Sequence, residues 1–332
     1  MRRTSKSSMV LGSMVIGALV LAGCGGGDDD AAEPAASGAG SAELTTVRVG
    51  AIPIVDVAPL YLGQEVGIFA DHGLEVEPFL AQGGAAIVPA VLSGEAEFGF
   101  SNITSLLQAE SRDVPLALVA PGSAASGDPA ADFAAVIVPA DSPVQEPADL
   151  AGTRVAINSI NNISDTVVRE TVRQDGGDPS SIQFVELAFP NMVAAVADGS
   201  VDAAFAVEPF ATVGVSQGMR VVAAPYTLTD EALTVAGYFT SDQYAAEEPE
   251  TVQAFADAMA EAQQYATEHP DAVREVLGSY TNIEPAIAQE LTLPSYQTEV
   301  DRGSVERLLE LGVEDGIIPE GVDLDNVFAD LQ

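Results

Sequence analysis

An internal repeat constrains the fold of this 332-residue chain more than any other feature. Residues 47–102 and 152–208 present the same series of patterns, about 105 residues apart. Each copy reads as a strand, a helix ending at glycine, a second strand, a second helix ending at glycine, and a third strand. Strands that alternate with helices predict a parallel sheet with helices packed on it. The two copies therefore predict an α/β fold with two doubly wound, Rossmann-like lobes.

The copies also agree at individual positions. Phe79 and Phe184 stand near the end of the second strand in each copy, and Gly94 and Gly199 end the second helices. Because phenylalanine, glycine and acidic positions agree together, we favour a duplication. Two unrelated α/β domains, or chance agreement in an alanine-rich sequence, are the alternatives.

Two further strand patterns, at 134–139 and 235–240, are interpreted as the crossings between the lobes. They divide the folded part into a first lobe, 45–135 plus 236–332, and a second lobe, 136–235. Two crossings of this kind act as hinges when two lobes close on a ligand. The last third of the chain has apolar residues at helical spacing, which predicts a helical C-terminal extension.

The N-terminal residues read as a lipoprotein signal. Three basic residues come first, an apolar stretch from Met9 to Leu21 follows, and the small residues Ala22 and Gly23 precede Cys24, the one cysteine of the chain. An apolar stretch this short suits a signal peptide and does not span a bilayer. We expect a signal peptide at 1–23, and a lipidated, flexible tether at 24–44. The protein would then lie on the outer face of the cytoplasmic membrane, held by its lipid anchor only.

The chain is strongly acidic, with 50 acidic residues against 12 basic ones and a net charge of −38. Such a surface repels phosphate backbones, so we expect no nucleic acid partner. The sequence contains no H-E-x-x-H, no G-x-x-x-x-G-K and no G-x-G-x-x-G motif, and its two histidines, His72 and His269, stand apart. We therefore expect no catalytic residues, no metal and no cofactor, in a protein that is not an enzyme.

Small, polar and aromatic residues occupy the expected strand-to-helix turns. Ligands of open α/β sheets bind at the carboxyl ends of the strands, where these turns lie. The candidate ligand-binding residues are Asp56, Gln82, Gly83, Ser101, Asn102, Asn158, Ser159, Asn161, Phe189 and Glu208. Each of the turns precedes a helix, so a helix N-cap is the alternative role at any single position.

The charge of the ligand stays open. Six helix N-termini around one cleft would offer backbone N–H groups to a sulfonate, carboxylate or phosphate without any arginine. No arginine falls in these turns. Asp56 and Glu208, in contrast, would suit an amine or a protonated heterocycle.

Several segments together resemble substrate-binding proteins for nitrate, alkanesulfonate, taurine and thiamine-pyrimidine precursors, the NMT1/THI5-like family. They are Gly50-Ala51-Ile52-Pro53-Ile54-Val55-Asp56-Val57-Ala58-Pro59-Leu60-Tyr61, Leu92-Ser93-Gly94-Glu95-Ala96-Glu97-Phe98-Gly99, and Val201-Asp202-Ala203-Ala204 with Glu208-Pro209-Phe210. The resemblance covers about residues 46–260. It implies a type II periplasmic-binding-protein fold that closes on its solute, with ligand contacts at the turns named above.

The resemblance also implies a function and partners. A sulfonate-, nitrate- or pyrimidine-precursor-like solute would be captured between the lobes and delivered to an ABC permease and its ATPase, by a protein that we expect to be a monomer. A ligand-sensing protein for a membrane receptor and a secreted enzyme on the same fold are the alternatives. A fungal enzyme branch of the family relies on a histidine and a cysteine-rich iron segment, which this sequence lacks beyond Cys24.

Overall fold

The computed structural model of the chain describes residues 44–327, which belong to one unit of tertiary contacts. The predicted signal peptide, Cys24 and nearly all of the predicted tether lie outside these residues, so cleavage and lipidation stay predictions. Within 44–327, no helix has both the length and the apolar character that crossing a bilayer requires.

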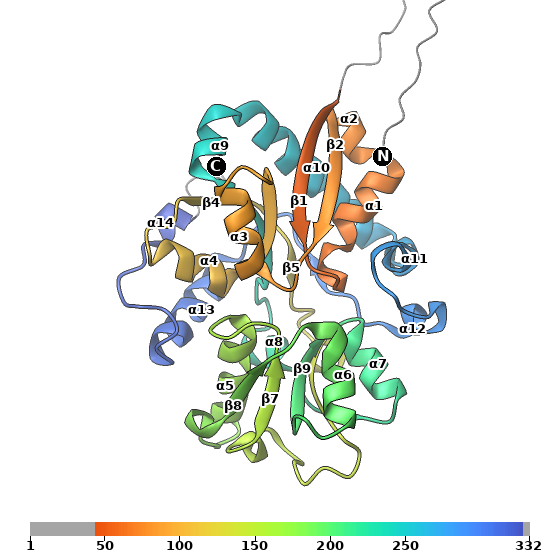
Figure 1. Cartoon of the computed structure of the whole chain (residues 1–332), viewed down its shortest axis with the longest axis vertical. Coiled ribbons are helices and arrows are strands. Elements are labelled where there is room, and N and C mark those ends of the chain that lie inside the picture. The colour runs from red at the N-terminus through yellow and green to blue at the C-terminus, as the bar shows by residue number, and fades with distance from the viewer. Residues whose placement is uncertain (1–43, 328–332) are drawn as a thin grey trace, which may run out of the picture. The chain divides into compact units, whose positions relative to one another are not determined.

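Two five-stranded sheets organise the structure (Figure 1). The first has the order β2-β1-β3-β11-β4, with β1 at Thr45–Ala51, β2 at Leu74–Leu80, β3 at Phe98–Asn102, β4 at Leu116–Pro121 and β11 at Ala236–Ser241. The second has the order β10-β6-β9-β7-β8, with β6 at Ala134–Val138, β7 at Arg154–Ile157, β8 at Gln183–Glu186, β9 at Ala203–Val207 and β10 at Arg220–Ala223. A small third sheet pairs β5 (Ser123–Ala124) with β12 (Ser295–Tyr296).

The order of strands and helices predicted for the two copies is confirmed by the two sheets. Strand β1 lies between β2 and β3, and β7 lies between β8 and β9, and all of these pairs are parallel. The helices that connect them are α1 (Ala58–Val66), α3 (Gly84–Leu92), α5 (Ile163–Gln174) and α6 (Phe189–Ala197). The other strands run antiparallel, β11 to both β3 and β4, and β6 to both β9 and β10. The predicted parallel arrangement therefore holds for the repeated units, and each complete sheet is mixed.

The two crossings lie just before the strands to which the sequence assigned them. The chain leaves β5 for β6 through the short helix η2 (Pro129–Ala131), and it returns from α8 (Pro225–Thr229) to β11. Strands β6 and β11 are fully buried. Buried backbone groups need hydrogen-bond partners, and these two strands find them within the sheets instead of spanning the space between the lobes.

The remaining helices complete both lobes and the C-terminal extension. They are η1 (Val55–Val57), α2 (Ile68–Asp71), α4 (Ile103–Glu110), η3 (Pro147–Leu150), η4 (Pro179–Ser181), α7 (Phe210–Ser216), α9 (Asp242–Glu247), α10 (Pro249–Glu268), α11 (Pro270–Tyr280), α12 (Pro285–Glu290), α13 (Arg302–Glu314) and α14 (Leu324–Val327). The helical extension is thus confirmed.

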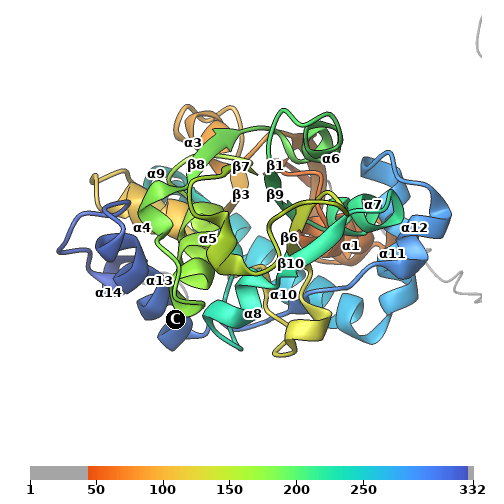
Figure 2. The same ribbon diagram turned by 90° about the horizontal axis from the view of Figure 1, so that it is seen from below.

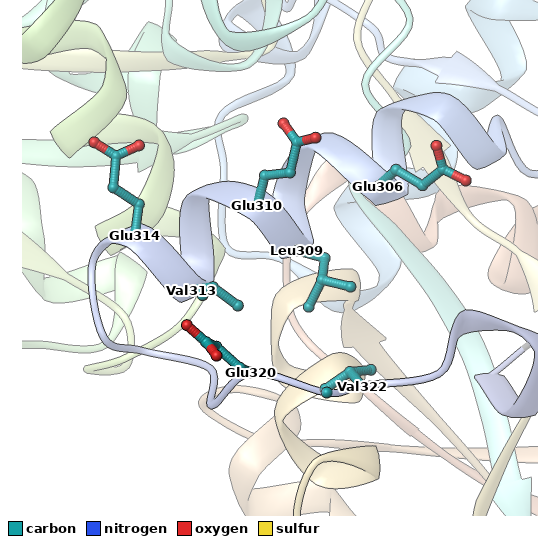
Figure 3. A pocket seen from close by; sticks show the side chains of 8 residues that line it. Glu306, Leu309, Glu310, Val313, Glu314, Glu320 and Val322 are labelled. Carbon is teal, nitrogen blue, oxygen red and sulfur yellow. The ribbon is translucent and has the colours of Figure 1, made fainter.

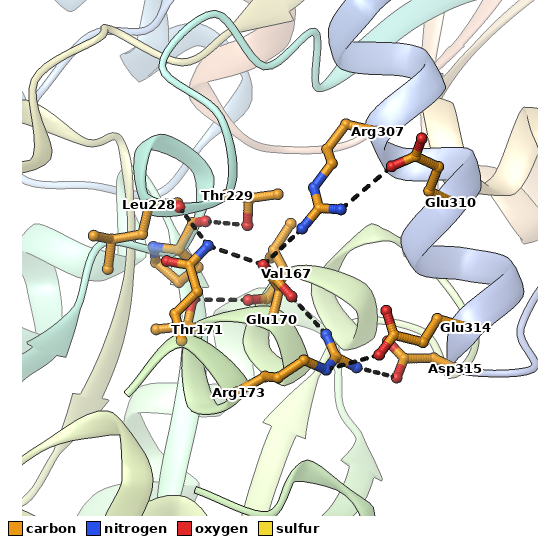
Figure 4. A network of polar contacts seen from close by, with 12 residues as sticks. Val167, Glu170, Thr171, Arg173, Leu228, Thr229, Arg307, Glu310, Glu314 and Asp315 are labelled. Carbon is orange, nitrogen blue, oxygen red and sulfur yellow. Dashed lines mark hydrogen bonds and ion pairs between the residues drawn. The ribbon is translucent and has the colours of Figure 1, made fainter. Parts of the chain in front are cut away.

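The C-terminal helices touch both lobes. Figure 2 shows α13 beside α4 and α5 on one side, and α11 and α12 beside α1 and α7 on the other. On the α13 side, the buried carboxylate of Glu170 in α5 accepts a hydrogen bond from Arg307 of α13 at 2.8 Å and one from Arg173 at 2.6 Å (Figure 4). Arg173 also donates to Asp315, just beyond α13, at 2.6 Å. The second lobe is therefore joined to the extension by ion pairs as well as by packing.

Candidate ligand-binding site

A small cavity of about 20 Å³ lies where the carboxyl ends of strands from the two lobes meet. We call it the interlobe cavity. It is lined by Ile52, Ile54, Asp56, Phe100, Asn102, Asn158, Ile163, Ser164, Phe189, Val207, Tyr226, Val235 and Ala236. Four of the predicted site residues are brought together here: Asp56, Asn102, Asn158 and Phe189. A volume of this size has room for about one water molecule.

Asp56 is the one charged residue among those that line the interlobe cavity. Its side chain comes from η1, directly after β1, and only 2% of the residue is exposed. Oδ1 accepts a hydrogen bond from the hydroxyl of Ser123, whereas Oδ2 is buried without a partner anywhere in residues 44–327. Burial raises the pKa of Asp56 to about 6, although the hydrogen bond from Ser123 opposes this shift. The cavity thus contains a carboxylate with one unused oxygen and no neighbouring cation.

Asn102 and Asn158 hydrogen-bond across the boundary between the lobes. Oδ1 of Asn102 accepts from the backbone N–H of Ser105 at 2.9 Å, which caps α4, and from that of Ile163 in the second lobe at 3.3 Å. The carbonyl of Asn158 accepts from Nε2 of Gln82 in the first lobe at 3.3 Å. The lobes are therefore in direct contact beside the cavity.

Gly83 and Ser159 lie at the same boundary. A Cβ atom on Gly83 would lie 3.1 Å from Nδ2 of Asn158 and 4.0 Å from Cβ of Ser159, so the absent side chain lets the lobes approach. Ser101 is fully buried and does not line the cavity. It lies against α3, because a Cβ on Gly84 would come 1.9 Å from its hydroxyl oxygen.

Two larger spaces adjoin the interlobe cavity. A groove of about 280 Å³, which we call the outer groove, is lined by Ile52, Pro53, Leu80, Ala81, Gln82, Ala188, Phe189 and Pro190. Ile52 and Phe189 line both the outer groove and the interlobe cavity, so they form the wall between them. The outer groove in turn shares Pro53, Leu80 and Pro190 with a space of about 620 Å³ beside α7, α11 and α12. The outer groove thus has lining residues in common with the interlobe cavity on one side and with this larger space on the other.

A further hollow of about 620 Å³ lies far along the chain from the predicted residues (Figure 3). Leu309 and Val313 of α13 and Val322 face it, and glutamates surround it. None of the ten predicted residues lines this hollow.

Asn161 and Glu208 are two more of the predicted residues that do not line the interlobe cavity. Asn161 is exposed in the turn before α5, where it has a φ of 57°, and its neighbour Asn162 supplies the cap of that helix. The carboxylate of Glu208 accepts from the backbone N–H of Thr212 at 3.0 Å, from its hydroxyl at 2.7 Å, and from the N–H of Thr292 at 3.3 Å. Ligand binding by these two residues stays a prediction, and the contacts of Glu208 favour the alternative, a helix cap.

Sequence reasoning missed Tyr226 and Ser123. Tyr226 stands at the start of α8 and lines the cavity, and burial together with the charges of Asp56 and Asp132 raises its pKa well above the usual value. Both residues lie outside the repeated units, which were the basis of the predicted turns. The signal for Tyr226 was a proline that opens a helix after strand β10, the same kind of turn as those in the repeat.

The sequence also contains one G-x-S-x-G string, Gly214-Val215-Ser216-Gln217-Gly218. In hydrolases this motif places the serine on a turn from a strand into a helix. Here Ser216 is the last residue of α7, and its hydroxyl donates to the carbonyl of Val213 at 2.8 Å. The string therefore ends a helix and forms no nucleophile elbow. Within the described part of the chain, no three His, Cys, Asp or Glu side chains gather as metal ligands.

Comparisons with known proteins agree with this architecture. The bicarbonate-binding protein CmpA of Synechococcus elongatus is 38% identical over 96 residues, which are 27% of this chain and 21% of CmpA. The taurine-binding periplasmic protein of Escherichia coli K12 is 26% identical over 214 residues, 64% of either chain. This chain therefore matches about a fifth of the length of the first relative and less than two thirds of the second.

The alkanesulfonate-binding protein SsuA from Xanthomonas axonopodis pv. citri, solved with MOPS bound, has a TM-score of 0.72 at 19% identity, with 86% of this chain and 99% of SsuA covered. This likeness confirms the predicted fold, that of the type II periplasmic binding proteins. The model of the family described as NMT1/THI5 like matches residues 54–273, which is well over half of the sequence. The chain belongs to the NMT1/THI5-like family.

Proposed function

We propose that this chain is an extracytoplasmic solute-binding protein, and not an enzyme, that captures a small organic solute between its lobes and delivers it to an ABC permease and its ATPase. One observation carries the proposal: both lobes contribute to the interlobe cavity, where Asp56 keeps one buried oxygen free of any partner in residues 44–327. Membership of the NMT1/THI5-like family and relatives named for binding bicarbonate and taurine support it.

Capture requires the lobes to move. A ligand pocket typically measures ~300 Å³ or more, whereas the interlobe cavity measures about 20 Å³. We propose that the first lobe, 45–135 plus 236–332, and the second lobe, 136–235, separate to admit the solute and then close. Opening would break the bonds from Gln82 to Asn158 and from Ile163 to Asn102, which are long at 3.3 Å. The crossings before β6 and β11 would act as the hinges.

The location follows from the N-terminal residues. We propose that the signal peptide is removed, that lipidated Cys24 holds a monomer on the outer face of the membrane, and that residues 24–44 allow the lobes to reach the permease. The membrane would be contacted through the lipid anchor only. Labelling of growing cells with a radioactive fatty acid tests this, since Cys24→Ala should abolish incorporation into the chain.

Ligand capture is tested by thermal unfolding of the purified chain with a panel of small amines, amidines, carboxylates and sulfonates. A ligand present at 100 times its Kd stabilises the folded state by ~2.7 kcal/mol, which raises Tm measurably. We expect at least one class to do so in a stoichiometric manner and without being converted. A panel that leaves Tm unchanged, or a bound compound that is turned over, contradicts the proposed function.

A further inference from the structure

The free oxygen of Asp56 indicates which charge the solute carries. This inference rests on the proposed function and concerns the same site. Among the residues that line the interlobe cavity and the outer groove, there is no arginine, lysine or histidine, and Asp56 is the one charged side chain. A buried carboxylate without a cation is costly, and a bound cation next to Oδ2 would remove that cost. A bound anion would increase it.

The N-termini of α4 and α5 bond their first N–H groups to side chains, whereas α1, α3 and α6 have no side-chain cap. Asn102 accepts from the N–H of Ser105 at the start of α4 and from the N–H of Ile163 at the start of α5. Asn162 accepts from the N–H of Ser164 at 2.9 Å, also in the first turn of α5. Because side chains already occupy these donors, α4 and α5 offer an anion less positive potential than uncapped helices would.

The remaining walls suit an organic cation. Phe100, Phe189 and Tyr226 place three aromatic side chains around the same cavity as Asp56. Aromatic faces attract ammonium and guanidinium-type groups through their quadrupole, most strongly when water is excluded. The strongly negative charge of the whole chain also raises the local concentration of cations.

The volumes of the interlobe cavity and the outer groove also suit an organic cation. A primary ammonium group is about as large as a water molecule, and the interlobe cavity of about 20 Å³ holds about one water. The outer groove, about 280 Å³ in volume and lined mainly by apolar residues, begins on the other side of Ile52 and Phe189. A solute with a small cationic head and an apolar body therefore matches the two spaces in order.

We infer that the site selects a small organic cation of the ammonium or amidinium type, whose N–H groups donate to Asp56 and whose apolar part lies against Phe189 toward the outer groove. Asp56 is then the residue that determines specificity. This assignment differs from what the names of the relatives state, since bicarbonate and alkanesulfonates are anions.

Probes of matched shape and opposite charge test the inference. Butylammonium and benzamidinium are compared with butanesulfonate and benzenesulfonate, together with bicarbonate, by calorimetry and thermal unfolding of the purified chain at pH 7.5. We expect binding of the cations and none of the anions. Asp56→Asn should weaken cation binding by about 100-fold, because a buried charge pair is lost. Asp165→Asn is the matched control, since it makes the same change at another buried aspartate, one that pairs with Arg169 outside the cavity, and we expect a change within about threefold for it.

The possible results separate the two proposals. Binding of a sulfonate or bicarbonate to the unaltered chain, strengthened by Asp56→Asn, would overturn the inference and leave solute capture standing. Equal weakening by both variants would also overturn it, because the effect would then be structural. If no probe of either charge binds, the proposed function fails as well. Even if a variant does not fold, the comparison of matched probes on the unaltered chain shows whether the site binds cations or anions.

Discussion

Replacing Asp56 with Asn should stabilise the ligand-free protein. The pKa of Asp56 is raised from 3.8 to about 6, first of all by burial. At pH 8 the carboxylate is therefore buried in its charged form, and a shift of about two units corresponds to ~3 kcal/mol of lost stability. Asparagine has nearly the same shape and still accepts from Ser123, although a neutral acceptor forms a weaker bond, and its amide N–H groups replace an oxygen that has no partner in residues 44–327. We expect the free energy of unfolding to increase by about 1 kcal/mol at pH 8.

The pH dependence identifies the cause of this effect. The folded protein binds the proton of Asp56 more tightly than the unfolded chain does, so this residue's contribution to stability falls as pH rises from about 4 to about 6. Urea unfolding of both proteins at several pH values isolates Asp56, because the other carboxylates cancel in the difference. The gain in the variant should be largest above pH 7 and disappear as the pH falls to about 5. A variant that is less stable at pH 8, or a gain that does not depend on pH, refutes the reasoning.

Three other substitutions test further contacts in the same unfolding assay. Glu208→Ala should lower the free energy of unfolding by about 1–2 kcal/mol, because the cap on α7 is lost, and should leave ligand affinity unchanged. A loss of affinity without a loss of stability would instead show that Glu208 contacts the ligand. Gly84→Ala should cost about 1–3 kcal/mol, because its Cβ would lie 1.9 Å from the hydroxyl of Ser101, and a crystal structure without displacement of α3 would contradict this. Glu170→Ala should lower the free energy of unfolding by about 2–4 kcal/mol, because two arginines share this buried carboxylate. Arg307→Ala should lower it less, since Arg173 remains paired with Glu170. Equal losses in these two variants would show that Arg173 contributes nothing.

The repeated units could be predicted from the sequence because their signals are local. Strand, glycine stop and turn recur within a few residues of one another, and each repeat contains its own parallel pairings. The direction of β11 is not a local property. A fully buried strand such as Ala236–Ser241 has the same apolar pattern whether it runs parallel or antiparallel to its neighbours. Its direction follows from where the chain re-enters the first lobe.

The site was predicted in part for a similar reason. Asp56, Asn102, Asn158 and Phe189 line the cavity because each lies at the end of a strand of the repeated units or in the turn after it. The sequence did not distinguish a ligand contact from a helix cap. Glu208 shows why, because the same carboxylate suits both roles, and the contacts with Thr212 and Thr292 that favour a cap come from tertiary packing. Tyr226 and Ser123 reach the site from outside the repeat, through tertiary packing.

The unpaired carboxylate connects stability with capture. Residues of both lobes line the cavity around Asp56, so in the proposed capture its loss of water would accompany the closing of the lobes. With a cation bound, the same closing forms a charge pair, and the free-energy cost of burying the carboxylate disappears. A cationic solute therefore favours the closed state by the free energy that burial of Asp56 costs without it. Asp56→Asn should therefore separate the two properties, with a more stable protein that closes without a ligand and binds cations weakly. A residue retained only for packing would lose stability and affinity together.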